Sequence, residues 1–211
     1  MLNIIPKEKF KSIPWKNGKG STLELAINPN GSLNDFEWRL SIAKVEEDGV
    51  FSDFTGYTRN LVLIDGEGIV LNHHEKHIDH LNKKLEFSTF DGANMTIAKL
   101  TAGTITDFNL MTRTTDFNGT VKTYSGTHEV VLDRTQICFI YGLSKKLEIE
   151  SVDFDNIEIL SVGDLMQITN EPDIEKVEIN VSGENFIVVY INKLESLKFN
   201  IIDQVETNLS E

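Results

Sequence analysis

The sequence predicts an all-β protein, built as a sandwich or a barrel of short strands. Apolar and polar residues alternate with a period of two over much of the chain, which is the pattern of half-buried strands. The connecting segments are short and rich in Gly, Asn and Asp, and no long window has a convincing helical stripe. Many short strands at this spacing are typical of a sandwich or a barrel.

The strands are expected in the following order. Residues 36–45 alternate most clearly: one face carries Phe36, Trp38, Leu40 and Ile42, and the other carries Glu37, Arg39, Ser41 and Ala43. Residues 59–71 are interpreted as two strands folded into a hairpin at Asp65-Gly66. Residues 73–85 are the best helical alternative. Further strands are expected at 85–90, 95–100, 136–142, 146–151, 156–162, 165–169 and 185–194.

Two pairs of segments resemble each other within the chain. Residues 60–66 and 136–142 are both apolar strands that end on a glycine, and residues 85–97 and 157–169 both bend at a Gly/Asp corner. Two copies of one β unit would give a duplicated jelly roll, while chance similarity among β-rich segments is the alternative. No low-complexity linker separates the halves, so we expect halves at 1–125 and 126–211, packed as one body.

Composition excludes several classes of partner. The 211 residues include 20 basic and 33 acidic ones, a net charge of −13, which repels nucleic acid and anionic membrane surfaces. Cys138 is the only cysteine, so an intramolecular disulfide and a CxxC motif are both absent. The sequence has neither a signal-peptide apolar region nor about 18 continuous apolar residues, and we expect a cytoplasmic protein. The oligomeric state is left open.

Residues 14–22, PWKNGKGST, raise three alternatives: a turn, a phosphate loop or one wall of a binding site. Gly18 and Gly20 flank Lys19 and allow positive φ and close approach to a ligand. A phosphate loop requires another spacing and a following helix, whereas a strand follows here. As a binding wall, the segment would use Trp15 as a flat face with an N–H donor and Asn17 as a donor and acceptor. Lys19 would add a cation at the mouth.

Two strands carry polar faces whose direction the sequence leaves open. Arg39 and Ser41 face either a cavity, where arginine suits a carboxylate, or solvent. A second polar set alternates along 107–113 and consists of Asp107, Asn109, Met111 and Arg113. This mixture of residue types favours a selective pocket. The alternative is a buried ion pair between Asp107 and an arginine that has only a structural role. Arg59 ranks below Arg39 and is expected to hold the turns at Asp53 or Asp65.

Four of the five histidines fall within residues 73–80, but we expect a solvated hairpin or turn rather than a metal site. Adjacent His73 and His74 point to opposite faces of a strand and cannot share a metal. Only a helix would let His77 chelate with either of them. We therefore predict no metal and no cofactor. Serine-triad spacing, a nucleophile elbow and a dinucleotide fingerprint are also absent.

Three segments resemble the HutD/Ves family in their order, spacing and residue types: 14–26, 36–68 and 107–113. The likeness is strong over about residues 10–125, and the family's three consecutive glycines are interrupted here by Lys19. The resemblance implies a cupin-like jelly roll duplicated as a bicupin, with a polar pocket in the N-terminal half. It also implies a modulator of histidine utilisation rather than an established enzyme. The implied ligand is a small anionic metabolite of the formylglutamate, urocanate or formate class.

The sequence therefore predicts a bicupin that binds a small carboxylate. Arg39 is expected to engage the carboxylate, Asn17, Ser41 and Asn109 to form hydrogen bonds, and Trp15 to cover the ligand. The complete predicted ligand-binding set is Trp15, Asn17, Gly18, Lys19, Arg39, Ser41, Asn109, Met111 and Arg113. The alternatives are a metal-dependent cupin enzyme, an isomerase or hydrolase, and a protein-interaction module with a vestigial pocket.

Overall fold

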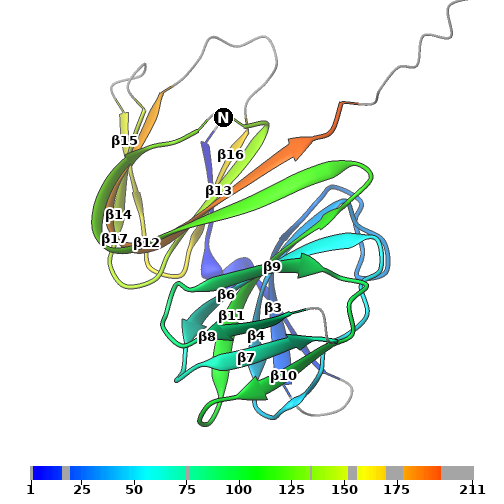
Figure 1. Ribbon diagram of the computed structural model, residues 1–211. Helices are drawn as coiled ribbons and strands as arrows, with labels where there is room; N and C mark the ends of the chain where they lie inside the picture. Colours follow the sequence, from blue (N-terminus) through cyan, green and yellow to red (C-terminus); the bar gives the residue numbers. More distant parts are fainter. Residues whose placement is uncertain are drawn as a thin grey trace, which may run out of the picture.

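The computed structural model describes residues 2–15, 20–74, 77–133, 135–151, 156–169 and 178–195. Within these ranges the chain consists of strands β1 to β17 and one short 3-10 helix, η1 (Lys7–Lys9). The strands form three sheets, arranged as an upper and a lower body in Figure 1. The all-β prediction is confirmed. No helix in the described part of the chain is both long and apolar enough to span a membrane.

The six-stranded sheet has the order β2-β3-β4-β11-β6-β9, and neighbouring strands are antiparallel. Its strands are β2 (Lys11–Pro14), β3 (Gly20–Ile27), β4 (Trp38–Val45), β6 (Tyr57–Asp65), β9 (Phe87–Asp91) and β11 (Ile105–Arg113). Because successive side chains on a strand point to opposite faces, the alternation predicted for residues 36–45 gives this sheet two distinct faces.

The four-stranded sheet covers one of those faces. Its order is β5-β10-β7-β8, with β5 (Gly49–Val50), β7 (Ile69–His73), β8 (Ile78–Leu81) and β10 (Thr96–Leu100). An apolar cluster lies between the two sheets, with Leu61 and Leu63 from β6 and Leu71 and Ala98 from the four-stranded sheet. These four side chains are buried, so the sheets are held together by burial of apolar surface.

The seven-stranded sheet forms the upper body in Figure 1 and has the order β1-β16-β13-β17-β14-β15, with β12 paired to β17. Its strands are β1 (Leu2–Ile5), β12 (Phe117–Val131), β13 (Ile137–Gly142), β14 (Leu147–Ser151), β15 (Asn156–Leu160), β16 (Leu165–Thr169) and β17 (Ile179–Lys193). Strand β1 pairs with β16, so the start of the chain joins strands from its second half.

A shared apolar core joins the seven-stranded sheet to the other face of the six-stranded sheet. The ring of Trp38 in β4 lies 5.3 Å from that of Phe139 in β13. Phe108 in β11 lies 5.7 Å from Tyr141, measured between ring centroids. The six-stranded sheet is therefore the middle layer, with an apolar face toward the second half of the chain and a mixed face toward the four-stranded sheet.

The hairpin predicted at Asp65-Gly66 is wrong. Strand β6 ends at Asp65 in the six-stranded sheet, whereas β7 begins at Ile69 in the four-stranded sheet, and the two strands are not paired. Gly66 and Gly68 have φ values of 101° and 128°, a backbone region that glycine adopts without a steric penalty. The prediction of a turn at this position is correct, but the turn connects two strands that belong to different sheets.

Strand β12 runs across residue 125, the predicted boundary between two halves. It pairs with β17, whose Phe186 and Ile187 are fully buried. The strand that crosses the predicted boundary is therefore paired with a strand of the buried core. The division at 1–125 and 126–211 and the duplication of one β unit both stay predictions.

Candidate ligand-binding site

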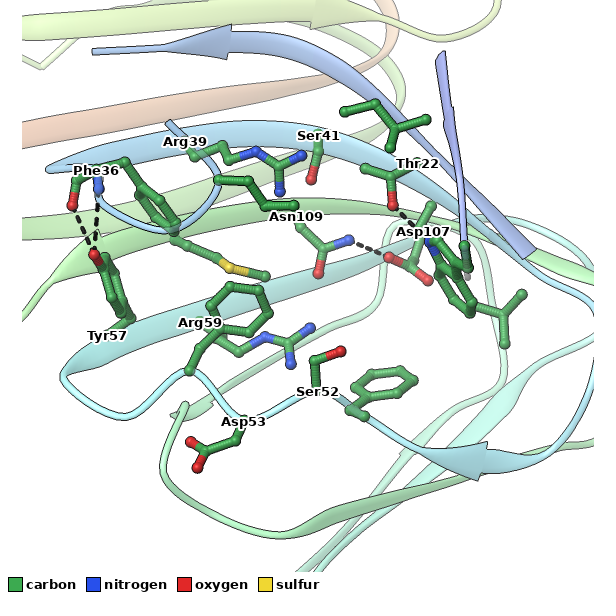
Figure 2. A pocket seen from close by; sticks show the side chains of 18 of the residues that line it. Thr22, Phe36, Arg39, Ser41, Ser52, Asp53, Tyr57, Arg59, Asp107 and Asn109 are labelled. Carbon is green, nitrogen blue, oxygen red and sulfur yellow. Dashed lines mark hydrogen bonds between the residues drawn. The ribbon is translucent and has the colours of Figure 1, made fainter. Parts of the chain in front are cut away.

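A cavity of about 830 Å³ lies on the mixed face of the six-stranded sheet (Figure 2). Strands β4, β6 and β11 form its floor, and the loops at residues 33–36 and 51–55 contribute to its walls. Its polar and charged lining residues are Thr22, Asn34, Arg39, Ser41, Ser52, Asp53, Thr55, Tyr57, Arg59, Asp107 and Asn109. A cavity with this mixed lining has the size and chemistry of a small-molecule site.

Strand register determines which side chains meet on the cavity floor. Met111 in β11 lies opposite Arg39 on β4 and opposite Arg59 on β6, so the two arginines flank one methionine across three strands. Two residues along β11, Asn109 lies opposite Ser41. Residues two apart on a strand share a face, and these side chains therefore all point toward the cavity.

The structure answers the question that the alternation of β4 left open. Arg39 and Ser41 are buried, with only 4% and 3% of their surface exposed, and both line the cavity. The polar face of β4 is therefore turned into the protein rather than toward solvent. Among the predicted ligand-binding residues, the cavity brings together Trp15, Arg39, Ser41, Asn109 and Met111.

Arg39 already has a charged partner. Its Nε donates to Oε2 of Glu24 in β3 at 2.9 Å, and both side chains are largely buried. An ion pair of this kind neutralises most of the charge that Arg39 would present to a ligand. Glu24 was not recognised from the sequence because its pairing with Arg39 depends on the contact between β3 and β4.

Arg59 has no such partner. Its Nε is buried without a hydrogen bond, and the side chain makes no ion pair among the described residues. The guanidinium carbon lies 5.1 Å from the ring centroids of Phe51 and Phe90 and 5.5 Å from that of Phe54, within the range of cation–π attraction. Burial lowers the pKa of Arg59 to about 10, against the attraction of Asp107, so the side chain remains charged at neutral pH.

Asp107 and Asn109 form a second polar group on β11. The Asn109 amide nitrogen donates to Oδ1 of Asp107, whereas Oδ2 of Asp107 and Oδ1 of Asn109 are buried without partners (Figure 2). Burial raises the pKa of Asp107 to about 7, although the Asn109 hydrogen bond and the nearby Arg59 oppose the rise. Near neutral pH the ionised form of Asp107, which only accepts hydrogen bonds, and the protonated form, which can also donate one, are therefore both populated.

Trp15 lies at the edge of the cavity, and its indole N–H donates to Oγ1 of Thr22 at 2.8 Å. Gly20 does not adopt the expected positive φ. A Cβ atom at this position would collide with the backbone carbonyl oxygen of Lys44 in β4 and would lie 2.9 Å from the Trp15 ring, so glycine is needed here for close packing. The predicted contacts of Asn17, Gly18 and Lys19 lie outside the described residues.

Arg113, which the sequence analysis includes in the binding set, does not line the cavity. Its guanidinium forms ion pairs with Asp35 and, at 3.4 Å, with Asp116. Asp35 adjoins Phe36, whose backbone carbonyl accepts the Tyr57 hydroxyl at 2.9 Å (Figure 2). Arg113 therefore contacts the loop that forms part of the cavity wall rather than the cavity itself.

Arg59, which was ranked below Arg39 from the sequence, lines the same cavity. Its expected partners were Asp53 and Asp65, but Asp53 instead accepts hydrogen bonds from the backbone and hydroxyl of Thr55, and Asp65 pairs with Lys84. A signal was available in β6, because Arg59 shares the alternation of Leu61 and Leu63 and so points to the same face as these buried residues.

Two facing sheets around a polar cavity define a protein of the cupin-like class. The fold resembles that of a cupin 2 conserved barrel domain protein from Leptotrichia buccalis, with a TM-score of 0.51 and 10% identity over 87% of this chain and 96% of the other. A family model described as HutD matches residues 7–189. The chain belongs to the HutD family.

Individual relatives agree with this assignment. The chain is 35% identical to an uncharacterized 21.2 kDa protein in the hutC 3' region of Pseudomonas putida, over 62% of this chain and 72% of the relative. It is 32% identical to protein Ves from Escherichia fergusonii, over 60% of this chain and 65% of the relative, slightly under two thirds of that protein's length. The structure of HutD from Pseudomonas fluorescens SBW25 (formate condition) superposes with a TM-score of 0.78 at 26% identity, over 92% of this chain and all of the other.

Proposed function

We propose that the protein binds a small carboxylate metabolite in the cavity of the six-stranded sheet and thereby modulates histidine utilisation. The observation that carries the proposal is the Arg59 guanidinium, buried in the cavity wall without an ion-pair partner among the described residues. Holding a charge out of water without a counter-charge costs several kcal/mol. An anionic guest supplies a counter-charge, which Asp107 provides only in its ionised form.

Arg59 is the main carboxylate contact in this proposal. Its planar guanidinium can donate two parallel hydrogen bonds to a carboxylate, and the surrounding phenylalanine rings limit competition from water. Arg39 lies on the far side of Met111 and contributes less net charge because Glu24 is bound to it. Burial and pairing thus reverse the order in which the sequence ranked the two arginines.

Asp107 and Asn109 would select the rest of the ligand. Neutral Asp107 can donate its proton to an anionic oxygen, whereas charged Asp107 would repel it. The unpartnered Oδ1 of Asn109 needs a donor, which a ligand with an N–H or O–H group provides. A carboxylate that also carries an N–H, as formylglutamate and urocanate do, meets both requirements, while formate meets only the first.

Trp15, Ser41 and Met111 complete the proposed site. The indole of Trp15 offers a flat apolar face at the cavity edge, and Ser41 offers a hydroxyl beside Asn109. The names of the relatives support the connection with histidine utilisation, since one is encoded beside hutC and another is called HutD. The participation of Asn17, Gly18 and Lys19 stays an expectation.

A thermal-shift titration with formylglutamate, urocanate and formate tests the binding proposal. A ligand that prefers the native state at about 100 times its Kd stabilises it by about 2.7 kcal/mol, so the midpoint should rise with concentration. Formamide is the matched control for formate because it has a similar size and no charge. Arg59→Met should remove the response, and Arg113→Met, outside the cavity, should keep it. An unchanged response in Arg59→Met, or no response to any of the three carboxylates, would overturn the proposal.

The modulator role needs a separate experiment in cells. Deletion of the gene should change growth on histidine as nitrogen source, and the wild-type gene and Arg113→Met should both restore it. Arg59→Met should fail to restore growth although the protein accumulates to normal levels. Normal growth of the deletion strain on histidine would remove the pathway assignment while leaving the binding proposal to the titration.

A further inference from the structure

The β7–β8 hairpin gathers three metal-ligating side chains that the cavity does not use. His73 is the last residue of β7, Asp79 lies in β8, and the backbone N–H of His73 donates to the carbonyl of His77 at 3.1 Å. Their ligand atoms all lie within 4.8 Å of one another. The sequence predicted a solvated hairpin or turn here rather than a metal site, because His73 and His74 point to opposite faces of a strand and only a helix would let His77 chelate with either of them.

The distances within this cluster suit a tetrahedral metal site. Nε2 of His73 and Nε2 of His77 lie 3.2 and 3.3 Å from the same atom, Oδ2 of Asp79. With metal–ligand bonds of about 2.0–2.1 Å, two ligands of a tetrahedral site lie about 3.4 Å apart. The two histidine–Asp79 distances match this spacing, and all three ligand atoms lie within 4.8 Å of one another.

Hydrogen bonds around the cluster orient the ligands. Because a carboxylate oxygen only accepts, Nε2–H of His73 donates to Oδ2 of Asp79 at 3.2 Å, and Nδ1 of His73 accepts from the Thr96 hydroxyl at 2.9 Å. Ser88 donates to the same Asp79 oxygen. Coordination of a metal through Nε2 would move the His73 proton to Nδ1, which would then donate to the Thr96 hydroxyl while that hydroxyl donates to the carbonyl of Asn94, 3.3 Å away. Support from outer hydrogen bonds is typical of histidine and carboxylate ligands in metal sites.

The three side chains of the cluster differ in burial. His73 is fully buried and its ring packs 4.5 Å from Phe90, whose ring also contacts Arg59. The side chains of His77 and Asp79 are 47% and 30% exposed, which leaves a path for a metal ion and space for a water ligand. The cluster lies behind Phe90, and none of its three residues lines the cavity.

We propose that His73, His77 and Asp79 form a binding site for one divalent transition-metal ion of the Zn²⁺ class. Two imidazoles and one carboxylate are ligands that zinc accepts, and the fourth position would be taken by water. Bound there, the ion would fix the turn between β7 and β8 and connect this hairpin, through Ser88 and Thr96, to β9 and β10. The three ligand residues lie outside the lining of the proposed carboxylate site.

Zinc binding by the tag-free chain tests the proposal, measured by isothermal titration calorimetry after dialysis against a chelator. We expect one Zn²⁺ per chain, and a higher unfolding midpoint with zinc than with chelator. His77→Ala and Asp79→Asn should each weaken binding by at least about tenfold, as the loss of one ligand does. Both replaced side chains are partly exposed, so the variants should remain folded. His73 is not replaced because it is fully buried.

His80→Ala is the matched control, because His80 lies on the same hairpin, is exposed and is outside the cluster. It should bind zinc like the wild type. Visible absorption of bound Co²⁺ gives a second measurement, which should report tetrahedral coordination in the wild type and disappear in His77→Ala. Absence of saturable binding, or equal loss of binding in His80→Ala and His77→Ala, would overturn the proposal.

Discussion

Arg39 on β4 and Arg59 on β6 flank Met111 on β11, the strand between them, yet of the two only Arg39 forms an ion pair in the described part of the chain. The two residues are of the same type, but the side chains around them differ. Glu24 neutralises Arg39, whereas Arg59 is surrounded by aromatic rings and approaches a carboxyl, Asp107, whose pKa is raised by burial. The two arginines should therefore respond in opposite ways to removal of their charge.

Arg59→Met should stabilise the unliganded protein. The substitution keeps an unbranched apolar side chain against Phe51 and Phe90 and removes a desolvated charge, so we expect a gain of about 1–3 kcal/mol in the free energy of unfolding. Urea denaturation of the purified variant measures this gain. Arg59→Lys keeps a charge and should not be stabilised. A large loss of stability in Arg59→Met would mean that the guanidinium is already satisfied without a ligand.

Arg39→Met should destabilise the protein, because Glu24 would be left largely buried without its partner. We expect a loss of about 2–3 kcal/mol. The double variant Glu24→Gln/Arg39→Met should recover much of this loss, and a double-mutant cycle gives the coupling energy directly. Additive effects of the two substitutions would show that the ion pair contributes nothing to the wild type.

Asp107 should make stability depend on pH. Its folded-state pKa, about 7, lies above its ordinary value of 3.8, so its stabilising contribution is complete below the ordinary value and is lost as pH rises through the folded value. Between about pH 5 and about pH 8.5 the wild type should lose on the order of 2–3 kcal/mol from this group. Asp107→Asn should lack this part of the pH dependence, which denaturation at both pH values measures. Parallel pH profiles for the two proteins would contradict the prediction.

The same carboxyl should control affinity for an anion. Carboxylate binding should weaken as pH rises through about 7, because charged Asp107 repels the ligand. Calorimetric titration at several pH values checks this, and Asp107→Asn should bind with little change over the same range. Stronger binding by the wild type at high pH would exclude direct contact between Asp107 and the carboxylate.

Gly20→Ala should displace Trp15 from the cavity edge. The added methyl group would collide with the backbone carbonyl of Lys44 in β4 and approach the indole ring at 2.9 Å, so the strain should lower the free energy of unfolding by about 1–3 kcal/mol. A changed tryptophan emission spectrum should accompany the loss of stability. Ser21→Ala, at the next position, is the control and should leave the spectrum unchanged. An unchanged spectrum in Gly20→Ala would show that Trp15 does not rest on this glycine.

Local alternation was sufficient to predict the two faces of β4. Trp38 and Leu40 are buried in the apolar core, and Arg39 and Ser41 point the other way, as the period of two requires. The sequence could not determine whether the polar face meets solvent, because that depends on the four-stranded sheet and on loops distant in sequence. The chain's similarity to a known family, rather than its periodicity, gave the cupin-like fold.

The contacts that the sequence did not predict are contacts between paired strands. Glu24 and Arg39 meet through the pairing of β3 with β4, and His73 meets Asp79 only because the turn between β7 and β8 reverses the chain. The turn at Gly66 was recognised, but the change of sheet that follows it depends on the partners available to β7. In each case the residue types were visible in the sequence, whereas the strand partners that bring them together were not.

The cavity floor is a single layer of strands, and its reverse side is packed directly against the second half of the chain. Asn109 and its neighbour Leu110 point in opposite directions from one backbone, the first toward the cavity and the second into the apolar core shared with β13 and β17. Close packing transmits small displacements instead of absorbing them. A displacement of β11 by the proposed ligand would therefore reach the apolar core that β11 shares with β13 and β17.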